Sequence, residues 1–440
     1  MTNKISSHMC ETQHIIIAGG GMVGLSLAIM LADRLPDTIE ISLIEKCAFS
    51  GVSNASKKNV LGNIQLPNLT YQPSFDARST AISAGSAELL QSIDCWKSLV
   101  PHVESIASIH ISDRGHYAST QLNATEQKID ALGYVVENRT LGHVLLQQLQ
   151  QTRVKVIAPA TVDKCRFTQH NVEIDLADNN REQAKKSSQK LSADLLIIAD
   201  GADSPLCKAI GIDTKKTAYK QSAIIANVAL EKPHNGMAYE RFTDQGPLAL
   251  LPLADCEQQH RAALVWTRNS IDAERLTSAS DEEFLNELQQ TMGYRASKII
   301  HVGERAFYPL ELVQSIEQVR SRVVVMGNAA HFLHPVAGQG FNLSLRDCAS
   351  LADTLADSLI DNARGNISVS NKIGALSTLQ QYLACRESDQ QRTIALTHTM
   401  VNTFSSNALS RSIFRQCGLL SLNAMPVAKK ILARQMMGLA

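Results

Sequence analysis

The first residues suited to chemistry are glycines that follow an apolar run near the start of the chain. Gly19, Gly20, Gly21, Met22, Val23 and Gly24 form a GxGxxG pattern. Glycines at this spacing permit a tight turn and let backbone amides approach a pyrophosphate at a helix N-terminus. Glu45, followed by Lys46, lies where a carboxylate is expected to accept hydrogen bonds from an adenosine ribose. The pattern therefore predicts a dinucleotide site.

Two later segments also place a polar loop after a short apolar stretch. Leu195 to Ala199 precede Asp200 and Gly201, and Val323 to Met326 precede Gly327 and Asn328. The third segment continues into a glycine-rich loop and then a helical pattern, and the loop residues of interest are Pro335, Gly338, Gln339, Gly340, Phe341 and Asn342. Since a lone GxGxxG motif cannot separate NAD from FAD, the choice of cofactor depends on these two segments.

These loops need a parallel sheet to bring them together. Ile15 to Ala18 and Ile39 to Ile44 are predicted strands on either side of a helix from Leu25 to Leu35, which is the opening of a doubly wound sheet. The polar stretches 50–73 and 179–189 are expected to be surface loops. A block of strand signals bounded by turn residues predicts a separate antiparallel sheet, with strands at 224–230, 239–242, 248–251 and 262–266. From Ser377 onward the pattern is mainly helical.

The composition excludes several classes of protein. Lysine plus arginine equal aspartate plus glutamate at 42 each, so no net field gathers nucleic acid, and no nucleic-acid partner is expected. The nine cysteines have no CxxC spacing, which indicates free thiols and no metal site. The polar first fourteen residues favour neither a signal peptide nor a membrane-spanning helix, so we expect a cytoplasmic protein.

The second and third segments resemble the DG and GD motifs of the group A flavoprotein hydroxylases, the family of para-hydroxybenzoate hydroxylase. The resemblance covers nearly the whole chain. Within that family, the stretches 76–79, 112–116, 238–252 and 327–343 are most similar to the ring hydroxylases of ubiquinone biosynthesis that act on 2-polyprenyl-6-methoxyphenol. The resemblance implies that Arg78 and Arg139 contact FAD and that Gly338 to Asn342 lie beside the isoalloxazine. Arg153, which falls between segments, is expected to be only a surface charge.

The resemblance also implies the fold class and its boundaries. We expect an α/β protein in which a three-layer, Rossmann-like FAD-binding domain is interrupted by an antiparallel-sheet substrate domain and followed by a helical C-terminal segment. The expected FAD-binding parts are 13–113, 114–215 with some substrate-domain strands, and 311–375. The substrate domain is expected at 216–310 and the helical segment at 376–440.

Two positions depart from the family pattern. Asn328 stands where the family usually has aspartate, and it still hydrogen-bonds a ribityl hydroxyl, but without charge assistance. Lys208 stands where the family usually has arginine, and it lacks the fork that binds a phosphate bidentately. This weakens the assignment of that segment to NADPH phosphate, although NAD(P)H remains the expected reductant and FAD the expected cofactor.

The reaction implied by the resemblance has two halves. NAD(P)H delivers hydride to FAD, and the reduced flavin captures O2 as a C4a-hydroperoxide whose terminal oxygen goes to the ring. Hydroxylation para to the hydroxyl converts a 2-polyprenyl-6-methoxyphenol into the 2-polyprenyl-6-methoxy-1,4-benzoquinol. The helix N-terminus after Gly338 supplies free amides and a positive dipole for the anionic edge of reduced flavin. His331 and His334 are expected to orient this loop, and the sequence assigns no catalytic base.

Three readings stay open at the level of sequence. The first is the polyprenyl-phenol hydroxylase, and the second is a sibling acting at another ring carbon, or an epoxidase or halogenase on the same fold. Halogenases of this fold carry a tryptophan-rich signature, which is missing because the chain has only Trp96 and Trp266. The third is a flavin-binding interaction protein without turnover.

The isoprenoid tail of such a substrate demands an apolar groove. Candidate walls are 224–230 and 246–253, although plain sheet core is the favoured interpretation of both. The apolar and basic pattern at 427–439 suits packing on the parent domain, with contact to the inner membrane or to other ubiquinone-biosynthesis proteins as the alternative.

Overall fold

The computed structural model describes residues 13–49, 59–61, 64–66, 78–115, 119–178, 189–256, 258–333, 338–363 and 373–404, together with 430, 434, 437 and 438. Its first layer is a six-stranded sheet with the strand order β10-β2-β1-β14-β22-β21, in which only β21 is antiparallel to its neighbour. The strands are β1 (Gln13–Ala18), β2 (Ile39–Ile44), β10 (Lys155–Ile157), β14 (Leu195–Ile198), β21 (Val319–Arg320) and β22 (Val323–Val325). The three predicted loops follow β1, β14 and β22, so neighbouring parallel strands deliver them to one edge.

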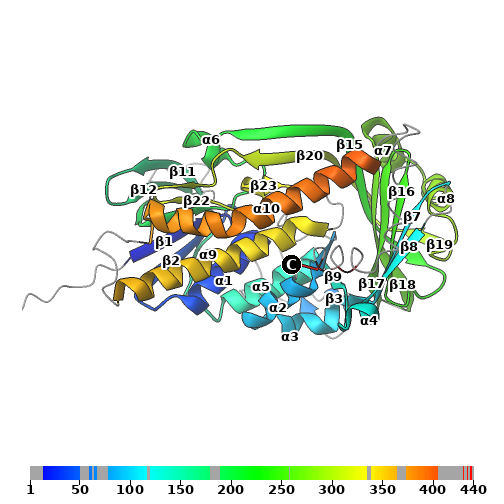
Figure 1. The fold of residues 1–440 in the computed structure, drawn as a ribbon, viewed down its shortest axis with the longest axis horizontal. Helices are drawn as coiled ribbons and strands as arrows, with labels where there is room; N and C mark the ends of the chain where they lie inside the picture. The colour runs from blue at the N-terminus through cyan, green and yellow to red at the C-terminus, as the bar shows by residue number, and fades with distance from the viewer. Residues whose placement is uncertain are drawn as a thin grey trace, which may run out of the picture.

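Layers on both faces bury this sheet, which explains why its strands are almost continuously apolar. Helices α1 (Met22–Arg34), α5 (Asn138–Leu149) and α9 (Gln339–Ala363) cover one face, and α10 (Leu376–Phe404) lies along α9 (Figure 1). An antiparallel meander of β11 (Ala160–Phe167), β12 (Val172–Asp178) and β13 (Gln189–Ala193) covers the other face.

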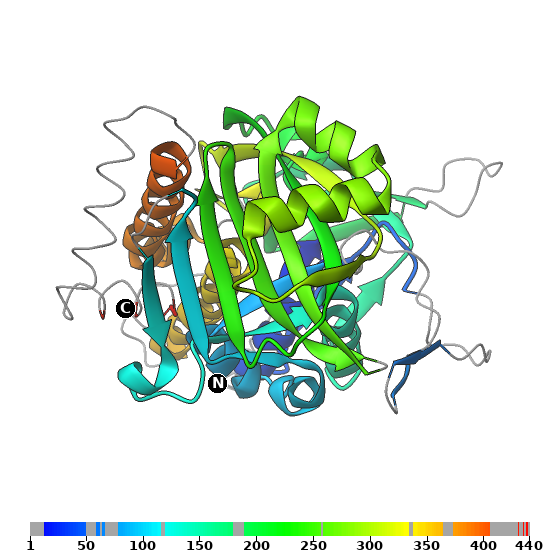
Figure 2. The same ribbon diagram turned by 90° about the vertical axis from the view of Figure 1, so that its right-hand side faces the viewer.

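A nine-stranded sheet stands at the other end of the molecule, with the order β23-β20-β15-β18-β17-β16-β7-β8 and with β19 paired to β15 (Figure 2). All of its pairs are antiparallel except β16 with β7. Its outer face is covered by α7 (Ser270–Ser278) and α8 (Asp281–Met292). Trp266 of the sheet packs edge to face against Phe284 of α8. The strands are β7 (Ser108–Asp113), β8 (Ser119–Asn123), β15 (Thr214–Leu230), β16 (Met237–Thr243), β17 (Gly246–Cys256), β18 (Gln259–Asn269), β19 (Ile299–Val302), β20 (Ala306–Ser315) and β23 (His331–Phe332).

The chain also forms several smaller elements. A three-stranded sheet has the order β5-β9-β6, and β3 pairs with β4 in a hairpin. Their bounds are β3 (Asn59–Leu61), β4 (Ile64–Leu66), β5 (Ser79–Ser83), β6 (Glu104–Ile106) and β9 (Gly133–Glu137). The remaining helices are α2 (Ala84–Ser92), α3 (Trp96–Leu99), α4 (Ala124–Gln127) and α6 (Pro205–Ala209), with 3-10 turns η1 (Val100–His102) and η2 (Gly327–Ala329).

The α/β fold with two sheets is confirmed, and several details differ from expectation. The first helix begins at Met22 rather than Leu25, and a hairpin interrupts the stretch 50–73 that was predicted to be a loop. The second sheet is mixed rather than wholly antiparallel, and it recruits β7 and β8 from early in the chain. The domain boundaries therefore stay a proposal. The segments 179–188 and, apart from isolated positions, 405–440 lie outside the described residues.

No helix in the described part of the chain combines the length and the apolar character needed to cross a membrane.

Candidate functional site

An outer cavity of about 500 Å³ opens where the three loop segments meet. Its walls include Gly19, Gly21, Met22, Val23, Glu45, Lys46, Asp200, Gly201, Asn328 and Phe341. Residues separated by some 300 positions in sequence thus line one space, as the order of β1, β14 and β22 requires. Sequence reasoning missed other lining residues that carry no motif, among them Cys47 and the β11 residues Thr161 and Val162.

The glycines of the first turn are required by the backbone. Gly19 has φ +112°, and a Cβ added there would lie 2.4 Å from the carbonyl oxygen of Ala199. A Cβ on Gly24 would lie 1.9 Å from the carbonyl oxygen of Gly19, so this glycine lets α1 pack closely on β1. Gly24 therefore supports the turn through its close contact with Gly19, whereas Gly21 lines the cavity itself.

Glu45 fixes the geometry of the same turn. It is 9% exposed, and its carboxylate accepts hydrogen bonds from the amides of Gly20 at 2.6 Å and Cys47 at 2.9 Å. A carboxylate oxygen can accept more than one hydrogen bond, so these contacts leave capacity for a ribose hydroxyl. Its position at the end of β2 is the predicted one.

Asp200 and Asn328 reach the cavity from the other two loops. The Oδ1 atom of Asp200 is buried and has no hydrogen-bond partner among the described residues. Burial raises the pKa of Asp200, although a hydrogen bond from Ser204 opposes that shift. A buried acceptor without a partner is costly, so this atom is a candidate acceptor for a ligand hydroxyl. Asn328 lines both this cavity and the one beyond it.

An inner cavity of about 350 Å³ adjoins the outer one and shares Met22, Asn328 and Phe341 with it. One side is formed by the loop around Gly338 and Gly340 and by Phe332 and Leu333. The other side is the inner face of the nine-stranded sheet, which contributes Ile109, Ile225, Pro247, Ala249, Leu251, Ala263, Val265 and Thr267. The predicted wall at 246–253 therefore lines the cavity, whereas most of 224–230 packs into the core beneath α7 and α8.

The two predicted arginines differ in placement. Arg78 lines the inner cavity, and its guanidinium lies 4.8 Å from the ring centroid of Tyr308, a cation–π contact that sequence reasoning missed. Arg139 pairs with Glu137 at 2.6 Å and is absent from the described walls of both cavities.

Arg153 is exposed, as predicted for a surface charge, but its guanidinium also has contacts that the sequence did not predict. Its guanidinium donates to the carbonyls of Leu35 at 2.7 Å and Pro36 at 3.1 Å, and it forms an ion pair with Asp37. It therefore holds the carboxyl end of α1 and is more than a surface charge.

The glycine-rich loop is held by its last residue. Asn342 is 1% exposed, and its Nδ2 donates to the carbonyls of Ala81 and Gly338 while its Oδ1 accepts from the amide of Ser83. Gly338 has φ +59°, where a Cβ would lie 2.9 Å from that of Ala81. A Cβ on Gly340 would meet no atom of the described residues within 4 Å, so among them the first turn of α9 faces open space. Gln339 is buried behind the loop, and Pro335 and His334 lie outside the described residues.

A buried ionic cluster supports the loop from behind. His331 Nε2 lies 2.8 Å from Asp347 on α9, and both side chains are 1% exposed. Arg386 on α10 approaches the other oxygen of Asp347 at 2.7 Å and also pairs with Asp389. Burial alone would raise the pKa of Asp347, but His331 and Arg386 outweigh it and lower the pKa. His331 therefore links the segment before the loop to α9, and the orienting role expected of the two histidines stays a prediction.

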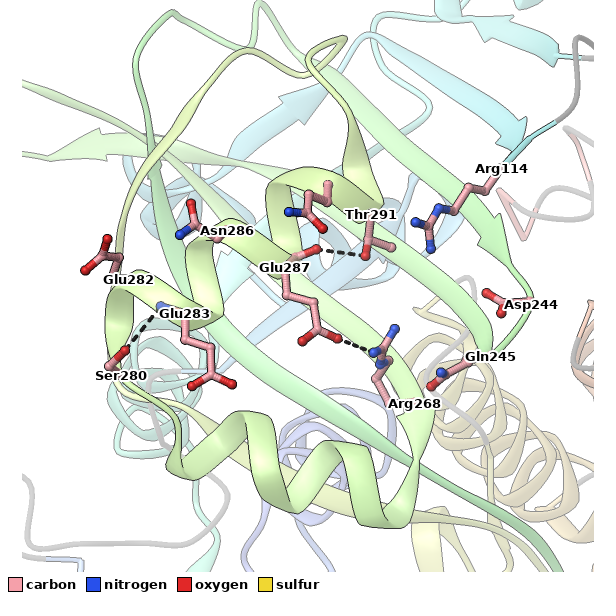
Figure 3. A pocket seen from close by; sticks show the side chains of 11 residues that line it. Arg114, Asp244, Gln245, Arg268, Ser280, Glu282, Glu283, Asn286, Glu287 and Thr291 are labelled. Carbon is pink, nitrogen blue, oxygen red and sulfur yellow. Dashed lines mark hydrogen bonds and ion pairs between the residues drawn. The ribbon is translucent and has the colours of Figure 1, made fainter.

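A third cleft is open and polar and lies away from these cavities, on the side of the nine-stranded sheet that carries α8 (Figure 3). Arg268 contacts Glu287 there, and its guanidinium lies over the ring of Trp266. The acidic side chains beside Arg268 already neutralise its positive charge. The cleft therefore resembles a solvated surface more than a binding site.

A dinucleotide trough that opens into an apolar cavity under a second sheet defines an FAD-dependent aromatic-ring monooxygenase. A family model described as an FAD binding domain matches residues 68–369, and the chain belongs to that family.

Individual relatives agree over nearly the full length. Ubiquinone hydroxylase UbiL of Rhodospirillum rubrum is 30% identical over 99% of this chain and 92% of its own. The 3-demethoxyubiquinol 3-hydroxylase of Escherichia coli is 28% identical over 98% of this chain and 99% of its own. Among solved structures, p-nitrophenol 4-monooxygenase PnpA from Pseudomonas putida superposes with a TM-score of 0.68 at 14% identity, covering 97% of this chain and 96% of that one.

Proposed function

We propose that this protein hydroxylates the ring of a polyprenylated phenol in ubiquinone biosynthesis, with FAD as cofactor, NAD(P)H as reductant and O2 as co-substrate. The main observation behind this proposal is that the two cavities are continuous, because Met22, Asn328 and Phe341 line both of them. A cofactor as long as FAD fits a trough that starts at Glu45 and ends under an apolar sheet. The names of the two relatives support the pathway.

The residues present fit FAD. The turn at Gly19 to Gly24, the carboxylate of Glu45 and the unpartnered Oδ1 of Asp200 would hold its ribose and pyrophosphate portions. Arg78 and the amides at Gly338 and Gly340 would face its ring. When bound, FAD supplies hydride acceptance and the activation of dioxygen. We keep Lys46, Gln339, Phe341 and Arg139 as candidates whose contacts remain to be tested.

The chain itself has to orient the substrate ring and exclude water. The inner cavity is suited to both tasks because side chains such as Ile109, Leu251 and Val265 surround it, and apolar walls shield a reactive oxygen species from solvent. The same walls would receive the start of an isoprenoid tail.

For the ring position, we propose hydroxylation of 2-polyprenyl-6-methoxyphenol para to its hydroxyl, giving 2-polyprenyl-6-methoxy-1,4-benzoquinol. A phenolic hydroxyl directs electrophilic oxygen to the ortho and para carbons. A second candidate is hydroxylation at another ring carbon, which the name of the Escherichia coli relative favours. Contact with the inner membrane and with other proteins of the pathway belongs to the proposal, because the substrate tail is lipid-soluble.

The proposal is tested in two steps. The purified protein should be yellow, should release FAD rather than FMN on boiling, and should couple NAD(P)H oxidation to hydroxylation of a short-chain 2-prenyl-6-methoxyphenol. In a strain lacking the gene, the quinone intermediate that accumulates identifies the ring carbon. Accumulation of the 6-methoxyphenol supports the para position, and a later, demethoxylated quinol supports the second candidate. Bound flavin without turnover on either compound would instead indicate a flavin-binding interaction protein.

A further inference from the structure

The inner cavity contains one carboxylate in an otherwise largely apolar wall. Among its described lining residues only Arg78 and Glu240 are charged. Side chains alternate along a strand, so Ala238 and Glu240 of β16 share the face that looks into the cavity. Glu240 is opposite Ala249 on β17 and Ile111 on β7, neither of which can pair with it.

No hydrogen bond or ion pair engages the Glu240 side chain within the described part of the chain. The nearby cationic side chains lie on the opposite face of the sheet. Arg295 contacts His110 there, and Arg241 points to that face because it follows Glu240 by one residue in the strand. Arg78 is the other charged residue on the described wall of the cavity. A half-buried carboxylate held among apolar side chains is unfavourable unless it serves a ligand.

We propose that Glu240 is the general base that accepts the phenolic proton of the ring substrate. The assignment rests on the proposed function. Glu240 lies on the wall that faces the Gly338 and Gly340 loop, so a ring held between sheet and cofactor would contact it. Sequence reasoning found no base, although Glu240 alternates with the apolar residues Ala238 and Phe242 along β16, and this pattern was a signal for one.

The step balances as follows. The phenolic O–H bond breaks, the proton moves to a carboxylate oxygen of Glu240, and the electron pair stays on the phenolic oxygen. That oxygen donates electron density to the ring, and a new C–O bond forms at an ortho or para carbon. One atom of dioxygen enters the ring and the other leaves as water, with NAD(P)H supplying two electrons. The displaced ring hydrogen leaves as a proton when aromaticity returns, and Glu240 gives its proton back to the phenolic oxygen.

The acidity of Glu240 suits this role. Burial raises its pKa to about 7, so the carboxylate is available at neutral pH while remaining a better proton acceptor than an ordinary glutamate.

The test compares Glu240→Gln with Glu231→Gln, an exposed glutamate at the end of β15 in the same sheet. Glu240→Gln should lower kcat for hydroxylation by about 100-fold, because a positioned base typically contributes 10² to 10⁴. The FAD dissociation constant and the rate of flavin reduction by NAD(P)H should stay within about two-fold of wild type, and KM should change less than kcat. Glu231→Gln should match the wild type throughout.

A second measurement distinguishes a general base from a residue that only lines the cavity. The wild-type kcat should rise with pH through a limb near pH 7, and Glu240→Gln should lose that limb. A ring-fluorinated analogue already ionised at the assay pH should narrow the difference between the two enzymes to below about ten-fold, since its proton has already left.

Equal rates and equal pH profiles in wild type and Glu240→Gln would overturn the assignment. If the glutamine variant loses FAD or melts early, Glu240→Asp is tested in its place. Its kcat should be lower than that of the wild type but should still rise with pH, and loss of that rise would also overturn the assignment. A wild-type enzyme that hydroxylates no phenol would refute the proposed function instead, so the two failures are distinguishable.

Discussion

Gly340 lies in the first turn of α9, where backbone amides have no partner within the helix. Gly340→Pro removes one such amide, and proline is tolerated in a first turn, so the fold should persist. If that amide stabilises the anionic edge of reduced flavin, the variant should lose about 3 kcal/mol of transition-state stabilisation, or roughly a hundredfold in hydroxylation rate.

Single-turnover hydroxylation measures this effect in variants that retain FAD and a near-normal melting temperature. Gly340→Ala keeps the amide, and its added Cβ meets no atom of the described residues within 4 Å, so it is the matched control. Wild-type rates in the proline variant would mean that the loop is scaffold only.

Arg78 is the one described cation on the wall of the inner cavity. Arg78→Ala should raise the FAD dissociation constant about ten-fold, because a hydrogen bond to a charged group contributes roughly 1.5–3 kcal/mol. Arg166→Ala, on the exposed meander strand β11, is the control because its 3.3 Å ion pair with Asp175 is open to solvent. Titration of both apoproteins with FAD checks this, and equal dissociation constants would remove Arg78 from the site.

Glu240 should also make stability depend on pH. Its pKa is raised to about 7 in the folded protein, so the unfolded chain releases this proton at lower pH. The folded state therefore loses stability as pH rises from about 4.5 to 7, by up to about 3 kcal/mol at roughly 1.4 kcal/mol per pKa unit.

Glu240→Gln should accordingly melt higher than wild type at pH 8 and close to wild type at pH 4.5, both with saturating FAD. A melting-temperature difference that is the same at both pH values would show that ionisation of Glu240 is not its cause.

At the scale of elements, Asp347 ties three of them together. Asp347 lies on α9 and contacts both His331 on β23 and Arg386 on α10, and all three side chains are buried. Asp347→Asn should lower the free energy of unfolding by about 3 kcal/mol, since it removes the buried carboxylate that His331 and Arg386 share and leaves Arg386 with Asp389 as its remaining counterion. Asp353→Asn on the same helix, where the aspartate side chain is 64% exposed and pairs with Arg34, should cost below about 1 kcal/mol.

Chemical unfolding of both variants with bound FAD measures the difference. Comparable losses in the two variants would contradict the role given to the cluster, and loss of FAD at unchanged stability would place Asp347 in cofactor binding instead.

The elements that could be predicted from sequence are those with strong local patterns. The apolar runs of β1, β2, β14 and β22 are buried on both faces, and the glycines after β1 have a steric reason visible in the motif. The parallel pairing of β16 with β7 joins segments more than 100 residues apart and has no local signature. The hydrogen bonds that engage Arg153 and Asn342 likewise depend on partners brought near only by the fold.

At the scale of the whole molecule, the outer cavity exists only when three distant loops are assembled, so FAD should bind the folded state alone. At a hundredfold excess over its dissociation constant it should stabilise by about 2.7 kcal/mol, a rise of roughly 3 °C in Tm for a chain of this size. FMN lacks the half that would reach Glu45 and should give less than about 1 °C at the same concentration. Thermal melts of the apoprotein check this, and equal shifts would place the adenosine half outside the cavity.

The strand order described above also has a consequence for synthesis. β14 and β22 complete one side of β1, yet Leu195 and Val323 leave the ribosome long after Ile15. At 5–20 residues per second, roughly 20 to 60 s separate Gly19 from Phe341 during translation. The edge of β1 lacks its partner strand until β14 emerges, roughly 10 to 40 s after β1 at the same rate, and chaperones are expected to shield it for that time. FAD is therefore expected to bind only after the segment that contains Phe341 has left the ribosome.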